Sequence, residues 1–135
     1  MIRLLICLIL LQSCTTTNKE PSLQNILTTN CYWDIVDESV INLINSCYKF
    51  NDDGSCYYFY YYFYNKARTD SVFRYNDDDV LVSNTWTIKG DSILNIRGIS
   101  YKLISYSMES IILKHSNRNE ALVLIKNCKT IHRKN

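Results

Sequence analysis

Glycine, proline and histidine are all scarce in this chain of 135 residues, which has three glycines, one proline and two histidines. So few glycines cannot build a dinucleotide-binding or phosphate-binding loop. The chain also lacks the Gly-x-Ser-x-Gly nucleophile turn and the His-Glu-x-x-His zinc motif. We therefore expect a protein that is not an enzyme and that needs no cofactor or metal.

An excess of charge of either sign is also missing. Lys and Arg together number 15 and Asp and Glu 13, which gives a formal net charge of +2. A nucleic-acid-binding domain usually shows a basic excess, so nucleic acid is not an expected partner. Hydrophobic residues make up 47% of the chain, enough to bury a core. Length and composition together predict a single globular domain.

The N-terminal apolar run is too short to cross a bilayer, which takes roughly 20 apolar residues. The run Leu4–Leu11 follows Arg3 and precedes Ser13 and Cys14. A basic start, a short apolar run and a small residue before the break are typical of a secretory signal. The stretch that follows is rich in Thr and Asn and is interpreted as a solvated tether.

The residues Leu11-Gln12-Ser13-Cys14 resemble the lipobox of bacterial lipoproteins. The resemblance implies that residues 1–13 are removed, that Cys14 is acylated with chains such as palmitate, and that residues 14–30 connect the lipid bilayer to the domain. Thr15 differs from the Asp that often signals inner-membrane retention in such lipoproteins. We therefore expect a lipid-anchored protein of the cell envelope, at the outer membrane, on its periplasmic face or its surface.

From Cys31 onward, short runs rich in Ile, Val, Tyr, Phe and Trp recur about every ten residues between Asn, Asp, Gly and Ser clusters. This pattern is typical of an all-β sandwich or barrel. The connections are short, so we predict an antiparallel meander of about eight or nine strands that closes on itself over residues 31–128, with a basic tail at 129–135. A helical turn at 22–27 and a short helix within 37–45 also fit the spacing. The expected strands are 31–36, 45–51, 55–64, 70–76, 80–89, 92–97, 99–105, 109–115 and 120–127.

Turn signals fix three of the expected registers. A two-residue turn at Arg97-Gly98 pairs Ile96 with Ile99 and Leu94 with Tyr101. A three-residue loop at 89–91 places Trp86 and Ile88 on the face of Leu94 and Ile96. A two-residue turn at Asp53-Gly54 pairs Cys47 with Tyr60.

These aromatic and turn residues occur in a recognisable order: Trp33, then Tyr48–Gly54, then Trp86–Asp91, then an apolar strand ending in Lys126. The order resembles the lipocalin-like domain of small bacterial lipoproteins, which implies a β-barrel. A barrel of about eight strands can be packed solid or can hold one small ligand. We expect the interior, and with it the binding site of a small hydrophobic ligand, to be lined by Trp33, Phe50, Phe59, Phe63, Trp86, Ile88, Leu94 and Tyr101.

The run Tyr57–Tyr64 is the most distinctive feature of the sequence. Strand alternation places its two phenylalanines on one side, which we assign to the interior. The other side then presents Tyr58, Tyr60, Tyr62 and Tyr64. This side is either ordinary strand surface or a platform for an envelope protein or a glycan.

Four cysteines remain in the mature domain, and they allow three pairings. In a closed meander the first and last strands are neighbours, which brings Cys31 close to Cys128, and we predict this disulfide. Cys47 and Cys56 flank a turn and are less readily joined; four free thiols are the alternative.

The sequence predicts a membrane-anchored, non-enzymatic binding lipoprotein that holds a small apolar ligand inside the barrel. The alternative is an interaction protein, such as a periplasmic inhibitor or a subunit of an envelope complex, that uses the Tyr-rich side.

Overall fold

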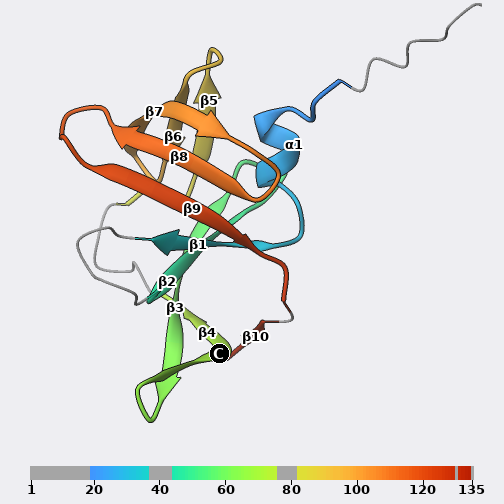
Figure 1. The fold of residues 1–135 in the computed structure, drawn as a ribbon, viewed down its shortest axis with the longest axis vertical. Helices are drawn as coiled ribbons and strands as arrows, with labels where there is room; N and C mark the ends of the chain where they lie inside the picture. Colours follow the sequence, from blue (N-terminus) through green and yellow to red (C-terminus); the bar gives the residue numbers. More distant parts are fainter. Residues whose placement is uncertain (1–18, 37–43, 76–81, 130, 135) are drawn as a thin grey trace, which may run out of the picture.

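The structure, a computed structural model, describes residues 19–36, 44–75, 82–129 and 131–134. These residues form one short helix, α1 (Leu23–Leu27), and a single ten-stranded sheet (Figure 1). The strands are β1 (Tyr32–Val36), β2 (Ser46–Phe50), β3 (Cys56–Tyr64), β4 (Ala67–Arg74), β5 (Trp86–Lys89), β6 (Ile93–Ile96), β7 (Ile99–Tyr106), β8 (Ser110–His115), β9 (Ala121–Asn127) and β10 (His132–Arg133).

The strand order is β10-β4-β3-β2-β1-β9-β8-β7-β6-β5. All neighbours are antiparallel except β10, which runs parallel to β4. The all-β, meander-like architecture is therefore confirmed, including the pairing of β1 with β9 that brings the first predicted strand beside the last. The strand β10 lies in the basic tail, where no strand was expected.

The predicted closure into a barrel is not found in the described residues. The sheet ends at β5 on one side and at β10 on the other. Across the gap, the described residues form an isolated bridge between Ser55, in the loop before β3, and Thr85, just before β5. Backbone hydrogen bonds flank that bridge, with Trp86 N donating to Gly54 O at 2.9 Å. Beyond it, β3 and β4 run away from β5–β8, so no continuous ladder forms (Figure 1).

Two hairpins follow the predicted patterns. Between β6 and β7, Ile96 pairs with Ile99 and Leu94 with Tyr101, as the Arg97-Gly98 turn requires. Between β5 and β6, Trp86 and Ile88 share a face with Leu94 as expected, although the loop occupies residues 90–92 and begins one residue later than predicted. Its first residue, Gly90, has φ +57°, a conformation that favours glycine.

The register between β2 and β3 was predicted wrongly. The loop has five residues, 51–55, and pairs Cys47 with Phe59 instead of Tyr60. The Asp53 carboxylate accepts hydrogen bonds from the Ser55 backbone N at 2.8 Å and the Ser55 hydroxyl at 2.6 Å, which stabilises the longer turn. A shift by one residue moves every side chain of a strand to the other face.

The main core lies on one side of the sheet, which we call the Trp33 face because Trp33 is fully buried there. The helix α1 completes this core: its apolar residues Leu23, Ile26 and Leu27 recur at helical spacing, and Ser22 caps its N-terminus. The Trp33 indole Nε1 donates to the Leu27 carbonyl at 3.2 Å. The buried members are Leu23, Ile26, Leu27, Trp33, Phe50, Cys56, Trp86, Leu94, Ile96, Tyr101, Ile111, Leu113 and Leu124.

A smaller apolar cluster occupies the opposite side, the Asp34 face. It buries Cys47, Phe59, Tyr61 and Val72. Ile131, from the segment that leads into β10, packs against this cluster. The last residues of the chain therefore close a second, smaller core.

Candidate functional site

Six of the eight residues predicted to line one interior lie together on the Trp33 face, and two do not. Trp33, Phe50, Trp86, Leu94 and Tyr101 belong to the main core, and Ile88 packs against it. Phe59 lies in the cluster of the Asp34 face, and Phe63 is 38% exposed. The register shift between β2 and β3 causes both misplacements, because it turns these two phenylalanines away from the Trp33 face.

The core of the Trp33 face consists of buried hydrophobic side chains. A pocket of about 420 Å³ does lie at its edge, between α1 and the hairpins of β5–β7. Of the eight predicted interior residues, only Ile88 lines it. The pocket wall consists of Ser22, Leu23, Gln24, Ile88, Gly90, Asp91, Leu103 and Tyr106.

The tyrosines of β3 form a continuous surface with rings from β2 and β4. This aromatic strip consists of Tyr48, Tyr58, Tyr60, Tyr62, Phe73 and Tyr75. Ring centroids are 5.4 Å apart for Tyr48 and Tyr58, 4.9 Å for Tyr58 and Tyr60, 5.7 Å for Tyr60 and Phe73, 4.8 Å for Tyr62 and Phe73, and 5.6 Å for Tyr60 and Tyr75.

The aromatic strip lies on the Trp33 face, because Trp33 pairs with Tyr48 and Tyr48 pairs with Tyr58. The assignment of Tyr58, Tyr60 and Tyr62 to the face away from the core was therefore wrong. They nevertheless reach solvent, because the β3–β4 hairpin extends past the strands that cover the rest of this face (Figure 1).

Exposure rises along the strip from its inner to its outer end. Tyr48 is half-buried beside Phe50 of the core, whereas Tyr62 is 37% exposed and Tyr75 is 41% exposed. Burial raises the pKa of Tyr58 to about 12, so its hydroxyl stays neutral at physiological pH. Tyr64, the fourth predicted platform residue, is 73% exposed at the end of β3.

Cations border the strip at both ends. The Arg97 guanidinium, on the β6–β7 turn, lies 5.5 Å from the centre of the Tyr58 ring. The Lys134 Nζ, at the end of the chain, lies 5.1 Å from that of Tyr62. Aromatic rings with cationic borders suit contact with a protein surface, where Tyr and Arg are enriched.

A buried carboxylate lies on the Asp34 face, where the sequence pattern did not predict one. Asp34 is 4% exposed and accepts hydrogen bonds from the Tyr61 hydroxyl at 2.5 Å, Arg68 Nη1 at 2.9 Å and Asn127 Nδ2 at 3.2 Å. Burial raises the pKa of Tyr61, so its hydroxyl remains a donor. The charge and its donors satisfy one another, so this cluster stabilises the fold and leaves no open position for a ligand.

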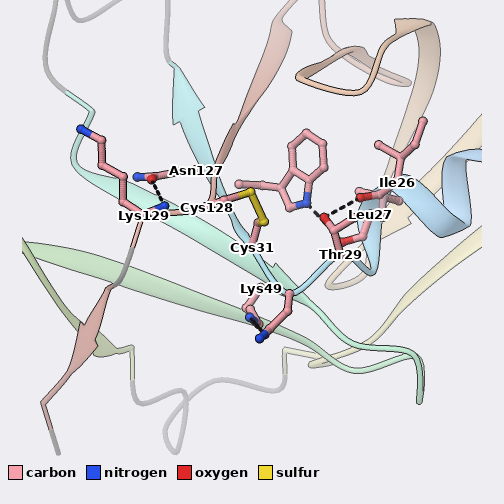
Figure 2. The surroundings of a disulfide bond; sticks show 10 residues. Ile26, Leu27, Thr29, Cys31, Lys49, Asn127, Cys128 and Lys129 are labelled. Atoms are coloured by element: carbon pink, nitrogen blue, oxygen red, sulfur yellow. Dashed lines mark hydrogen bonds between the residues drawn. A yellow bond between two sulfur atoms is a disulfide. The ribbon is translucent and has the colours of Figure 1, made fainter.

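The cysteines divide by position. Cys31 and Cys128 form a disulfide with 4.5 Å between their Cα atoms, which links the start of β1 to the end of β9 (Figure 2). Next to it, the Asn127 side chain accepts from the Lys129 backbone N at 3.2 Å. Cys47 and Cys56 are free and buried, and burial raises the pKa of each thiol to about 12. Cys14 lies outside the described residues.

Within the described ranges, no group of three or more His, Cys, Asp or Glu side chains could hold a metal ion. No helix in those ranges is long and apolar enough to span a membrane.

The structure defines an all-β protein with a ten-stranded sheet. A scan against protein-family models finds no match to this chain, and a search of curated proteins finds no relative.

Proposed function

We propose that this chain is a lipid-anchored, non-enzymatic binding protein of the cell envelope that docks a protein partner on its aromatic strip. The lipobox-like residues at 11–14 support the anchor. The observation that carries the docking role is the continuous set of ring contacts on a hairpin that extends beyond the core, with Tyr62 and Tyr75 exposed to solvent. We also propose that the chain is related to lipocalin-like lipoproteins, because its Trp and turn residues occur in the same order.

Tyrosine suits such a surface for a physical reason. Each ring offers a large apolar area with only two rotatable side-chain bonds, so little conformational entropy is lost on contact. The strip rings already pack edge-to-face or stacked against one another, which restricts them further before a partner arrives. Preorganisation of this kind raises affinity because less ordering remains to be done on binding.

The experiment is site-specific photo-crosslinking in intact cells. A benzoyl-phenylalanine replaces Tyr62 or Tyr75 in the strip, and Ile104 in the control, because Ile104 is 55% exposed but lies outside the strip and outside the pocket beside α1. We expect one adduct of discrete mass from both strip positions and none from the control position. The triple variant Tyr60→Ser, Tyr62→Ser, Tyr75→Ser should then lose at least tenfold in affinity for the purified partner.

Two results would refute the docking role. One is the same set of adducts from Ile104 as from the strip. The other is undiminished partner binding by the triple variant, provided that its circular dichroism spectrum and cooperative unfolding match those of the wild type.

The pocket beside α1 favours a second candidate function, the binding of a small apolar ligand. Leu23, Ile88 and Leu103 give its wall an apolar part, and about 420 Å³ suffices for a small molecule. Native mass spectrometry of the purified chain should then show a bound species that is absent from Leu103→Trp, in which the larger ring fills the pocket. An unliganded wild-type spectrum after extraction from cell envelopes would exclude this function.

A further inference from the structure

Two lysines face each other across neighbouring strands of the Asp34 face. Lys102 on β7 is the direct partner of Lys114 on β8, and both side chains are exposed. The next strand places Ile93 opposite Lys102. Like charges directly opposite each other in an antiparallel pair are destabilising, so this position is unfavourable for the isolated fold.

A pocket of about 540 Å³ lies over this lysine pair and beside the β8–β9 turn. Its wall contains no carboxylate: it consists of Ile93, Lys102, Lys114, His115, Ser116, Asn117, Arg118 and Asn119. In the described part of the chain the ion pair formed is Arg68 with Asp34, at a distance from this pocket along the sheet. The three pocket cations therefore have no carboxylate partner among the described residues.

Local hydrogen bonds fix the His115 ring and the β8–β9 turn in the remaining wall. His115 Nδ1 accepts from the Asn117 backbone N at 3.1 Å, so a neutral His115 ring carries its proton on Nε2 and can donate there. Ser116 N donates to Ser100 O and His115 N to Glu120 O, which hold the turn in place. Three cations, an imidazole donor and amide groups thus surround one concave space.

We propose that this pocket binds a phosphate group. Phosphate presents several acceptor oxygens, which Arg and Lys recognise through charge-assisted hydrogen bonds. The group can come from a free phosphate compound or from the headgroup of an anionic lipid, and both share the same chemistry at the pocket. The proposal is independent of the aromatic strip, which lies on the other face and on other strands.

The experiment titrates the purified full chain with inorganic phosphate, and separately with phosphatidylglycerol vesicles, and follows the melting temperature and heat of binding. The test variant is Lys102→Gln with Lys114→Gln. The matched control is Lys66→Gln with Lys129→Gln, which removes the same charge from exposed positions outside the pocket.

We expect saturable phosphate binding by the wild type and the control, and at least a tenfold loss of affinity in the test variant. Without phosphate, the test variant should melt at a higher temperature than the wild type, because the like-charge pair is gone. With phosphate, its gain in melting temperature should be smaller. A purely structural effect of the substitutions would leave the phosphate-induced gain in melting temperature unchanged.

The two probes identify the source of the phosphate. Binding to inorganic phosphate indicates a soluble compound. Tighter binding to phosphatidylglycerol vesicles than to phosphatidylcholine vesicles, lost in the test variant, indicates an anionic lipid headgroup. The proposal is overturned by absence of binding to both probes, or by equal affinities of the test and control variants.

Discussion

At the scale of single residues, Asp34 shows how a charge is accommodated on a strand that is otherwise apolar. Its carboxylate is buried, but the Tyr61 hydroxyl, the Arg68 guanidinium and the Asn127 amide donate to it from three other strands. Removal of one member of a buried charged pair leaves the other desolvated and unpaired. The arrangement therefore ties β1, β3, β4 and β9 together.

Asp34→Ala should lower the free energy of unfolding by about 3 kcal/mol, because three donors lose their acceptor. The value lies at the lower end for buried pairs, since the Arg68 side chain is 28% exposed and stays partly solvated. Urea denaturation measures the change. Asp70→Ala, on the exposed side of β4, is the control and should change stability by less than about 0.5 kcal/mol; an equally small effect of Asp34→Ala would contradict the account.

The free thiols predict a loss of stability in alkali. Burial raises the pKa of Cys56 in the folded protein from an ordinary value of 9.0 to about 12. Between these two values the unfolded chain ionises its thiol while the folded chain cannot. The stabilising contribution of the neutral thiol is therefore complete below pH 9 and disappears as the pH rises toward 12.

Comparison of the wild type with Cys56→Ala isolates this effect. From pH 8 to pH 10.5, the wild type should lose about 2 kcal/mol relative to the variant, since 1.5 pH units above the unfolded pKa correspond to that free energy. Denaturant titrations at both pH values measure the difference. A stability gap that stays constant with pH would show that Cys56 ionises equally readily in both states.

At the scale of elements, the sequence predicted the strand register correctly at the β6–β7 turn, whose backbone conformation allows one pairing. It predicted the wrong register at the β2–β3 turn, where side-chain hydrogen bonds lengthen the loop. The Arg97-Gly98 turn, with positive φ at both residues, fixed the β6–β7 pairing. The Asp53-Gly54 signal was equally strong, but the hydrogen bonds of Asp53 to Ser55 make a five-residue loop there. The resulting register shift of one residue changed the face of every β3 side chain, and the predicted interior changed with it.

Two features of the fold had no signal in the local sequence. The strand β10 consists of His132 and Arg133, polar residues whose pairing with β4 depends on where the disulfide places the tail. Asp34 is a lone acid within an apolar strand, and its partners are 27 to 93 residues away in the sequence. Such contacts depend on the tertiary arrangement, which strand periodicity does not describe.

The disulfide should be a major source of stability for the sheet. Cys31 and Cys128 close a loop with a sequence separation of 97, and the chain-entropy estimate for a loop of this size is about 4–5 kcal/mol. Cys31→Ser should lower the urea midpoint accordingly, and a reductant should destabilise the wild type but not this variant. Equal midpoints for the wild type with and without reductant, once free thiols have been counted, would refute this role.

At the scale of the whole molecule, the sheet places the two proposed binding surfaces on opposite faces. The aromatic strip lies on the Trp33 face at the β3–β4 end, and the lysine pair lies on the Asp34 face at the β7–β8 end.

A chain acylated at Cys14 would have eight residues between the anchor and the first residue of α1, Leu23. Fully extended, these reach roughly 28 Å, so an anchored domain would stay close to the bilayer. A partner of the strip would then be a protein at or near the same membrane.

This arrangement depends on the anchor, which a substitution can test. Cys14→Ala should abolish acylation, and the chain should either leave the membrane fraction or remain as an unprocessed precursor. The physical reason is that several acyl chains hold a protein firmly, at about 0.8 kcal/mol for each buried methylene, whereas the apolar run before Cys14 is too short to span the bilayer. Membrane fractionation with intact-mass spectrometry measures both the location and the processing.

The matched control for the anchor is Cys7→Ala, which removes the other N-terminal thiol but leaves the residues at 11–14 intact. This variant should be processed like the wild type, with a mature chain that begins at Cys14 and carries the added mass of acyl groups. If Cys14→Ala is instead processed and retained in the membrane as the wild type is, the proposal of a lipid anchor at Cys14 is wrong. The aromatic strip would then have to find its partner without the proximity that the bilayer provides.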